Sequence, residues 1–253
     1  MSTLTFLGTG TSHGIPVIGC GCEVCTSKDE RDRRYRSSVL LTKDDFSLLI
    51  DSGPEFRLQA LRCGLKHLDA VLYTHDHADH FNGIDDLRVF CNDRHLPVYT
   101  SEPVKRAIEE RFPYVVNGTA LGIPHLDVTV LTPYETVSIG PFQVTAIPII
   151  HGKKRIYGYR IDNTAYLTDC SEVPPESLPA LQNLEVLVVG ALRLWPHPHH
   201  YSVFEATALG KLLKSERVYF THLSHHLGHA QLEAQLADGF YVAYDQLTIT
   251  MKD

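Results

Sequence analysis

The sequence predicts an α/β protein in which two sheets pack against each other and helices cover their outer faces. Three observations support this fold class. Strand-like apolar runs recur along the whole chain, helical patterns separate the later runs, and no linker divides the chain into halves. A chain of 253 residues is long enough to bury an extensive core. We therefore expect residues 1–253 to form a single domain.

The expected strands are short runs of apolar and β-branched residues. The early runs are grouped, whereas the later ones alternate with helical patterns, which fits two packed sheets. The runs are residues 4–7, 38–41, 47–50, 70–73, 128–131, 144–149, 185–189, 218–220 and 247–250.

The expected helices lie at residues 54–63, 80–90, 103–111, 202–213 and 229–236. Gly64 follows the first of them and supplies a C-terminal stop. Ser202 and Glu205 have the spacing of a capping box, so the fourth helix should begin just after Tyr201. The stretch 112–125 contains two prolines and two glycines and is expected to be a surface loop.

Composition limits the function. The formal net charge is −7, and no basic run is longer than the short segment 31–36, so nucleic acid is disfavoured as a partner. No window approaches the ~20 apolar residues of a membrane helix, so no membrane partner is expected. Three of the six cysteines, Cys20, Cys22 and Cys25, fall within six positions. This spacing indicates a metal-binding cluster in a cytoplasmic protein rather than a disulfide framework.

The segment Thr74-His-Asp-His-Ala-Asp-His80 has the densest set of metal-binding groups. It follows a strand-like run, and side chains at i and i+2 of an extended segment point the same way, so His75 and His77 can face one ion. A helix then begins, and Asp79 and His80 can face a second ion nearby. Imidazole and carboxylate together suit Zn²⁺, Mn²⁺ or Fe²⁺. The simpler interpretation is a polar loop that happens to be rich in histidine.

This motif resembles that of the metallo-β-lactamase superfamily. The resemblance implies a four-layer αβ/βα sandwich, with a two-metal site completed by single residues at later strand ends. His151, Asp169 and His222 occur in the expected order, each just after a strand-like run. The family pattern would assign one ion to His75, His77, His151 and Asp169, and the other to Asp79, His80, Asp169 and His222. Asp169 would then serve both ions, whose charge offsets the repulsion between the carboxylates.

The cysteine cluster offers three thiolates, one fewer than a closed tetrahedral zinc site needs. His225, three residues after His222, is the candidate for the fourth ligand. We expect a structural Zn²⁺ held by a loop at about residues 19–26. The alternative is a buried trio of reduced thiols without an ion.

A narrower resemblance is carried by both ends of the chain. The run Leu7-Gly-Thr-Gly-Thr-Ser-His-Gly-Ile-Pro16, the cysteine cluster after it and Thr221-His-Leu-Ser-His225 are similar to the phosphoribosyl cyclic phosphodiesterase branch of the superfamily. In that branch a histidine shortly before a C-terminal helix assists the leaving group. His200 matches best here, with His199 as the substitute. His13 is a candidate for lining the pocket, and Arg88 either contacts phosphate or forms an ion pair on a helix surface.

The resulting hypothesis is hydrolysis of a small phosphodiester, such as a cyclic ribose phosphate. Two cations, Mn²⁺ or Zn²⁺, would share a hydroxide, Asp79 would take part in the catalytic site, and His200 would protonate the departing alkoxide. The enzyme alternative is a thioester or lactone hydrolase of the same superfamily. The non-enzyme alternative is a metal-binding pathway-accessory protein. Family analogy suggests a homodimer.

Overall fold

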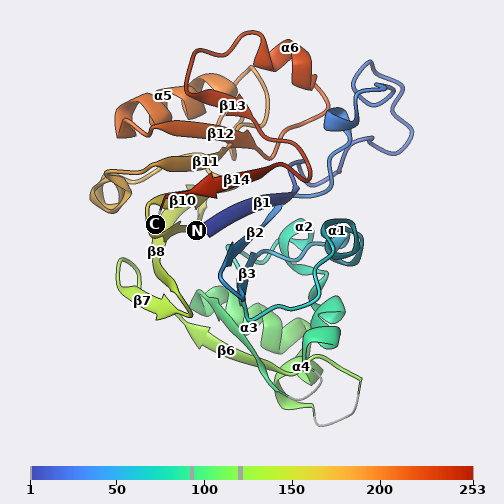
Figure 1. Ribbon diagram of the computed structural model, residues 1–253, viewed down its shortest axis with the longest axis vertical. Coiled ribbons are helices and arrows are strands. Elements are labelled where there is room, and N and C mark those ends of the chain that lie inside the picture. Colours follow the sequence, from blue (N-terminus) through green and yellow to red (C-terminus); the bar gives the residue numbers. More distant parts are fainter. Residues whose placement is uncertain (1, 92–93, 119–121, 253) are drawn as a thin grey trace.

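The computed structural model describes residues 2–252 except 92–93 and 119–121. It contains two sheets of seven strands each, with strand orders β14-β1-β2-β3-β4-β5-β6 and β13-β12-β11-β10-β9-β8-β7. Helices α1 to α4 lie beside the first sheet, and α5 and α6 lie beside the second (Figure 1). The predicted α/β architecture of two sheets with outer helices is therefore confirmed.

The first sheet is built from β1 (Ser2–Gly8), β2 (Ser38–Lys43), β3 (Phe46–Ile50), β4 (Ala70–Leu72), β5 (Leu96–Thr100), β6 (Leu126–Val130) and β14 (Thr248–Met251). The second sheet contains β7 (Thr136–Ile139), β8 (Phe142–His151), β9 (Lys154–Ile161), β10 (Thr164–Leu167), β11 (Val186–Gly190), β12 (Arg217–Thr221) and β13 (Phe240–Val242).

The α-helices are α1 (Phe56–Cys63), α2 (Ala78–Phe81), α3 (Glu102–Arg111), α4 (Pro113–Asn117), α5 (Val203–Leu213) and α6 (His229–Glu233). The 3-10 helices are η1 (Glu30–Asp32), η2 (Ile84–Phe90) and η3 (Pro175–Leu181).

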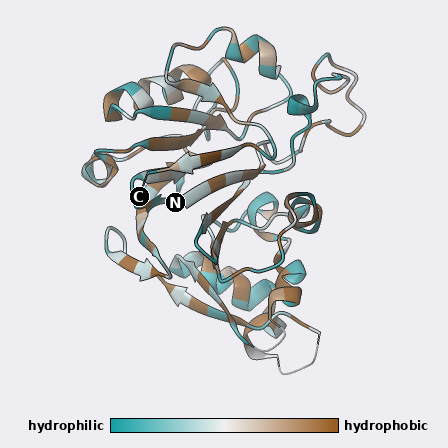
Figure 2. Cartoon of the chain, in the orientation of Figure 1, coloured by the Kyte–Doolittle hydropathy of each residue, from teal (hydrophilic) through white to brown (hydrophobic). Residues whose placement is uncertain are grey.

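Three hydrophobic clusters correspond to the interfaces between layers. The first lies between the sheets and joins residues such as Phe6 and Leu41 to Phe142 and Val188. The second packs the other sheet against α5 and α6, and the third packs the first sheet against α1 and α3. Hydrophobic residues follow the strands, whereas the outer helices and loops carry much of the hydrophilic surface (Figure 2). The arrangement is helix, sheet, sheet, helix.

Both predicted helix ends with specific signals are confirmed. Gly64 ends α1 with a φ of 70°, and its N–H donates to the carbonyls of the last turn. Ser202 and Glu205 form the reciprocal capping box of α5. The N-cap of this helix therefore lies two residues after His200, as the sequence predicted.

Two expectations about local structure were wrong. The helix expected at 80–90 is divided into α2 and η2, because Gly83 donates its N–H to Ser52 O at 2.9 Å instead of continuing the helix. The loop expected at 112–125 contains the short helix α4, while its residues 119–121 lie outside the described part. Among the described residues, no helix is both long and apolar enough to cross a bilayer.

Candidate metal centre

The predicted turn from strand to helix is present in the histidine-rich segment. Strand β4 ends at Leu72, residues 74–77 continue without helical structure, and α2 begins at Ala78. The backbone at His77 is extended, and its ring centroid lies 4.6 Å from that of His75. His80, on α2, places its ring 4.4 Å from His75 as well. The fold therefore gathers all three histidines in one small volume.

Later strands bring the remaining candidates to the same place. Two sets are formed in which the possible ligand atoms all lie within 4.8 Å of one another. They are His75, His77, His151 and Asp169, and Asp79, His80, Asp169 and His222. These are the two groupings that the family resemblance implied.

Asp169 lies between the two sets with one oxygen toward each. Its Oδ2 is 3.7 Å from Nε2 of both His75 and His151. Its Oδ1 is 3.2 Å from His80 Nε2 and 3.0 Å from His222 Nε2. A single buried carboxylate thus has the geometry to serve two ions.

The backbone at the strand ends is unusual in a way that favours this convergence. Asp169 follows β10 with a φ of 51°, and His222 follows β12 with a φ of 55°. For residues other than glycine this left-handed conformation costs about 1–3 kcal/mol and clusters at functional sites. It turns each side chain out of its parallel strand and toward α2.

The chemistry of the donors fits divalent cations. Among the described residues, the buried Nε2 atoms of His75, His80 and His222 have no hydrogen-bond partner, which leaves polar groups that need one. Burial lowers the pKa of His75 well below its usual value, so this ring is in the neutral form that binds metals. Burial also disfavours a charge on Asp169, but His222 and His80 hold the pKa of its carboxyl well below the usual range. The neutral ring of His75 and the ionised carboxylate of Asp169 are the forms that metal ions require. Burial opposes a charge on His80, but Asp79 and Asp169 raise its pKa well above the usual value, and a bound cation would replace that proton.

Asp51 is a functional residue that the sequence reasoning missed. It is fully buried after β3, and its Oδ2 lies 2.7 Å from His80 Nδ1. Its other contacts are the N–H and hydroxyl of Thr74, at 2.9 and 2.8 Å. A carboxylate that accepts a hydrogen bond from Nδ1 leaves Nε2 of the same ring free to face a metal ion. The signal was present, because Asp51 follows an apolar strand as Asp169 does.

The segment before α5 separates the roles of two neighbouring histidines. The main-chain oxygen of His199 lies 2.8 Å from His151 Nδ1, and the His199 ring packs over Gly152. The His200 ring instead enters the centre and stacks on His222, with centroids 5.0 Å apart. Its Nδ1 is 3.9 Å from Asp169 Oδ2. Of the two candidates, His200 is the one whose side chain faces the reacting region.

The four predicted members of the cysteine site are also brought together. The Sγ atoms of Cys20, Cys22 and Cys25 lie 3.3, 3.5 and 3.6 Å from His225 Nδ1. Sulfur and nitrogen ligands of a tetrahedral zinc ion are separated by about 3.6 Å. The Cys25 N–H is the main cause that lowers the pKa of the Cys22 thiol to about 6. The geometry therefore fits a closed metal site joining the N-terminal loop to the segment after β12.

Two other sequence candidates, and one further residue of the histidine-rich segment, lie outside the two metal-ligand sets. Arg88 forms an ion pair with Asp85 at 3.1 Å, as the helix-surface interpretation expected. His13 is an exposed side chain and does not belong to any of the ligand groups. Asp76 accepts from Arg111 at 3.0 Å and lies 3.5 Å from Lys154 Nζ, so it organises the rim of the centre.

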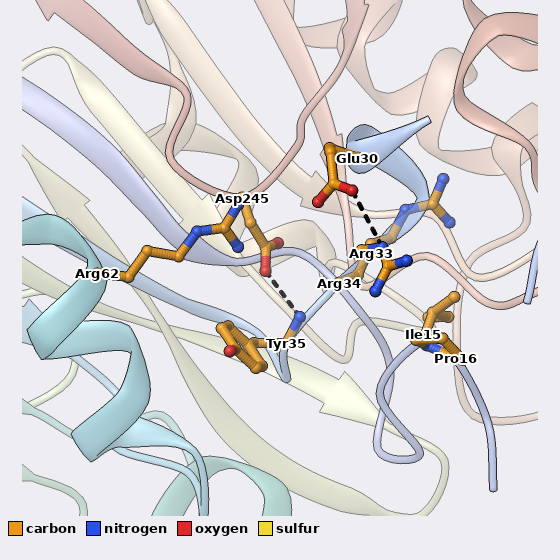
Figure 3. A pocket seen from close by; sticks show the side chains of 8 residues that line it. All are labelled: Ile15, Pro16, Glu30, Arg33, Arg34, Tyr35, Arg62 and Asp245. Atoms are coloured by element: carbon orange, nitrogen blue, oxygen red, sulfur yellow. Dashed lines mark hydrogen bonds and ion pairs between the residues drawn. The ribbon is translucent and has the colours of Figure 1, made fainter. Parts of the chain in front are cut away.

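Two cavities help to locate the chemistry. One of about 280 Å³ adjoins the centre and is lined by residues that include His75, Asp76, Lys154 and Arg155. Another, of about 390 Å³, is lined by Ile15, Pro16, Glu30, Arg33, Arg34, Tyr35, Arg62 and Asp245 (Figure 3). None of the residues lining this second cavity belongs to a metal-ligand set. The first cavity is therefore the better candidate for substrate entry.

Comparison with known proteins agrees with this geometry. Residues 47–223 match the family model described as the β-lactamase superfamily domain. An octanoyltransferase from Porphyromonas gingivalis is 37% identical over 259 residues, covering 98% of this chain. This chain spans only 52% of that relative, about half its length.

Solved structures add detail to the match. The crystal structure of a diphosphatase of the PhnP family is similar with a TM-score of 0.93 and 39% identity, covering 100% of this chain and 98% of the other. Zinc-bound PqqB from Methylobacterium extorquens has a TM-score of 0.79 at 18% identity, covering 98% and 100% of the two chains, and so shares the fold. The fold and the family match together support a metal-dependent hydrolase. This chain belongs to the metallo-β-lactamase superfamily, near its PhnP branch.

Proposed function

We propose that this protein hydrolyses a phosphodiester of a small molecule. The observation that carries the proposal is Asp169, whose two oxygens each face a separate cluster of histidines. One carboxylate placed between two ligand sets is the arrangement that two-metal hydrolases need to hold their ions about 3.5–4 Å apart.

The two ligand sets described above would hold two divalent cations, Mn²⁺ or Zn²⁺. When bound, such a pair supplies a hydroxide nucleophile at neutral pH and neutralises charge on the phosphoryl group. Cys20, Cys22, Cys25 and His225 would hold a structural Zn²⁺, which thiolate ligands favour. Asp51 accepts from Nδ1 of His80, and the His199 carbonyl accepts from Nδ1 of His151. In each ring this leaves Nε2 unprotonated and able to bind a metal ion.

His200 would handle the proton of the leaving group. Burial lowers the pKa of this ring to about 3, so it is neutral near neutral pH in the free protein. A bound anionic phosphate favours the protonated ring, since an opposite charge nearby stabilises the charged form. We therefore assign the acid role to His200 in the substrate complex.

Diphosphate cleavage is a second candidate. Its support is the diphosphatase activity named for the PhnP-family structure, which is similar over the whole of this chain. Phosphodiester and diphosphate share an anionic phosphorus centre and an oxygen leaving group, so the same residues can serve either substrate. A thioester or lactone ground state lacks that charge, so such a substrate would add no anionic group beside His200.

Octanoyl transfer, the activity named for the Porphyromonas gingivalis relative, has less support in this half-length match. Covalent acyl transfer needs an activated nucleophile. The cysteine beside the centre, Cys170, is buried, and burial raises the pKa of its thiol to about 12. This thiol is therefore poorly suited to carry an acyl group.

Turnover by the metal-loaded protein tests the proposal. We would compare bis(p-nitrophenyl) phosphate, a dinucleoside diphosphate and a glutathione thioester, each with Mn²⁺ and with Zn²⁺. The proposal expects hydrolysis of at least one phosphorus substrate and little of the thioester. Preference for the thioester would support the alternative hydrolase. Metal analysis that found one tightly held zinc, with no hydrolysis of any substrate, would support the accessory protein instead.

We also propose that the protein forms a homodimer, as family analogy suggests. Light scattering would test this.

A further inference from the structure

Arg34 is a charged side chain with no part in the chemistry proposed above, yet its side chain is 0% exposed. Arginine is almost never fully buried unless it is paired, because removing its charge from water costs several kcal/mol. Its partner is Asp32, whose Oδ1 lies 3.1 Å from Arg34 Nη2. At this burial the other donors of the guanidinium also need hydrogen-bond partners.

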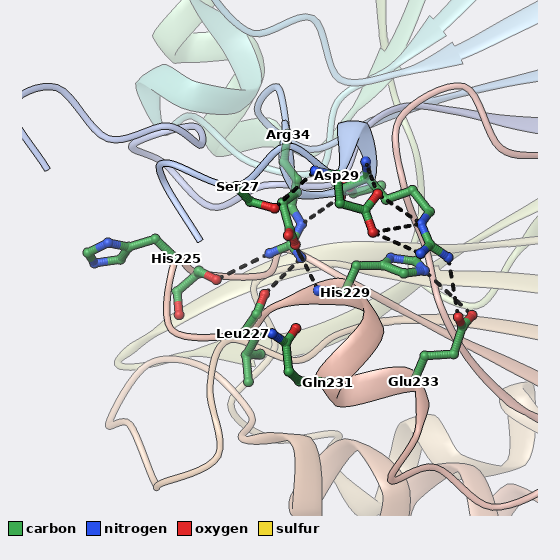
Figure 4. A network of polar contacts seen from close by, with 12 residues as sticks. Ser27, Asp29, Arg34, His225, Leu227, His229, Gln231 and Glu233 are labelled. Atoms are coloured by element: carbon green, nitrogen blue, oxygen red, sulfur yellow. Dashed lines mark hydrogen bonds and ion pairs between the residues drawn. The ribbon is translucent and has the colours of Figure 1, made fainter. Parts of the chain in front are cut away.

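Two further hydrogen bonds of the Arg34 guanidinium bind main-chain carbonyls of a distant loop, while its Nε donates to the nearby Arg31 O at 3.4 Å. Nη2 donates to Leu227 O at 2.8 Å, and Nη1 donates to Ser224 O at 3.3 Å. These two carbonyls flank His225 and His226 in the sequence. Figure 4 shows Arg34 beside the segment that carries His225 and Leu227. One guanidinium therefore contacts both sides of this turn, in which Ser224 O also accepts from the Leu227 N–H at 3.2 Å.

Asp32 extends this clamp to the end of the loop. The same Oδ1 that contacts Arg34 accepts from the His229 N–H, at the first residue of α6, at 2.7 Å. At the other end, Leu223 is held by main-chain hydrogen bonds with Thr9 and Thr11, at 2.9 and 3.2 Å. The loop 222–229 is thus fixed from outside at its beginning, middle and end.

This loop carries a candidate ligand of each metal site. His222 Nε2 lies 3.0 Å from Asp169 Oδ1 in the two-metal centre, and His225 Nδ1 lies 3.3 Å from Cys20 Sγ in the cysteine cluster. Metal ligands must be held within about 0.5 Å of their working positions by their surroundings. A loop without regular structure cannot do this unless other groups fix its course.

We propose that Arg34 is a positioning residue for both metal sites, which fixes the loop from His222 to Leu227 and so raises the affinity of the two-metal centre. The proposal rests on the metal sites of the proposed function but not on the choice of substrate. Residues that orient metal ligands typically change metal affinity by about 10–100-fold when replaced.

Arg34→Lys is the informative substitution. Lysine keeps a positive charge beside Asp32, so that carboxylate is not left unpaired. Its single ammonium group cannot reproduce the planar fork that reaches a carboxylate and two carbonyls at once. Arg33→Lys is the matched control, because Arg33 is an exposed neighbour whose guanidinium lies 3.3 Å from Glu30.

The test measures metal binding without any substrate. Each protein is stripped with a chelator and titrated with Mn²⁺, with free Mn²⁺ read by electron paramagnetic resonance. Zn²⁺ is titrated against a chromophoric chelator, and the melting temperature is recorded in parallel. We expect Arg34→Lys to bind the ions of the two-metal centre and the zinc of the cysteine site about 10–100-fold more weakly than the wild type, and Arg33→Lys to match the wild type.

Unchanged affinities in Arg34→Lys, with only a lower melting temperature, would overturn the positioning role. If that variant does not fold, the double variant Asp32→Asn/Arg34→Met would be titrated instead, because it removes both charges of this buried pair. Its metal affinities are judged in the same way. A wild-type protein that binds neither ion would instead remove the metal centre itself, and the proposed function with it.

Discussion

The Nδ1 atom of His151 lies 2.8 Å from the main-chain oxygen of His199, so a backbone group orients a candidate metal ligand. The neighbouring His200 ring stacks against His222 on the other side of the centre. Two adjacent residues thus act differently, one through its carbonyl and the other through its side chain. The next residue, Tyr201, is fixed by main-chain hydrogen bonds with Cys170 and Leu192, at 2.6 and 2.9 Å.

This difference gives the first prediction. His200→Ala should keep both metal ions but lower kcat by about 10²–10⁴-fold on a diester with a poor alkoxide leaving group. The loss should be smaller with nitrophenolate, which hardly needs a proton to depart. His199→Ala is the control, because it preserves the carbonyl that holds His151. Equal losses on both substrates would argue against proton transfer by His200.

Asp169 gives the second prediction. Asp169→Ala should lose most of the metal in the two-metal centre and nearly all hydrolysis, because both ions lose a shared negative ligand. Asp169→Asn, which keeps the shape but not the charge, should lose affinity for both ions as well. Metal content by mass spectrometry and kcat on a diester would be measured together. Retention of two ions with near-normal kcat would exclude a bridging role.

The cysteine cluster gives the third prediction. Cys22→Ser and His225→Ala should each lose about one zinc per chain and melt roughly 5–15 °C lower, because zinc binding contributes directly to folding free energy. Cys63→Ser, a cysteine outside the cluster, should do neither. The zinc should also resist chelators that strip the two-metal centre. A His225→Ala protein with full zinc content and unchanged melting would remove His225 from the site.

The fourth prediction concerns stability and pH. Burial is the main cause that raises the pKa of Asp245 to about 7, although its oxygens accept from Thr9 and the Tyr35 N–H. In the unfolded chain the same group ionises near pH 4. Its contribution to the free energy of unfolding is therefore fully present below about pH 4 and is lost as the pH rises to 7. The loss is on the order of 4 kcal/mol.

Asp245→Asn should remove this pH dependence, because the amide stays neutral. We would measure the free energy of unfolding in urea for the wild type and the variant between pH 5 and 8. The difference between the two free energies would then be compared at each pH. The exposed Asp238→Asn serves as the control. A difference that stays constant with pH would mean that Asp245 is ionised in the folded protein throughout this range.

The candidate metal centre was the most predictable part of the molecule. The spacing of His75, His77, Asp79 and His80 is local, so the sequence alone indicates how a strand followed by a helix presents these side chains. His151, Asp169 and His222 required the family pattern, because a single histidine or aspartate after a strand is an ordinary feature. Asp51 could have been found by the same rule applied one strand earlier.

The parts of the fold that the sequence did not predict depend on contacts with residues far away in the chain. Strand β9 begins with Lys154 and Arg155 and contains Gly158, so it does not look like a buried strand. At Gly158 a Cβ would lie 2.4 Å from the Leu167 side chain and 3.0 Å from Tyr166 O, so the neighbouring strand favours a glycine there. The helix expected at 80–90 breaks at Gly83, where a Cβ would lie 2.0 Å from Gly53 O. In both places a distant segment, rather than the local pattern, determines the conformation.

The pairing of the first and last strands has a practical consequence for handling the protein. Ser2 lies opposite Met251 in the β1–β14 pair. Strands β1 and β3 both run antiparallel to β2, so they run parallel to each other. The N-terminal end of β1 therefore lies at the opposite end of the sheet from Asp51 and His75, which follow the C-terminal ends of β3 and β4. A fluorophore or an affinity handle attached near Ser2 or near Met251 would therefore lie at the same end of the strands of the first sheet. Tethering the molecule to a surface there would leave the entrance to the centre facing the solution.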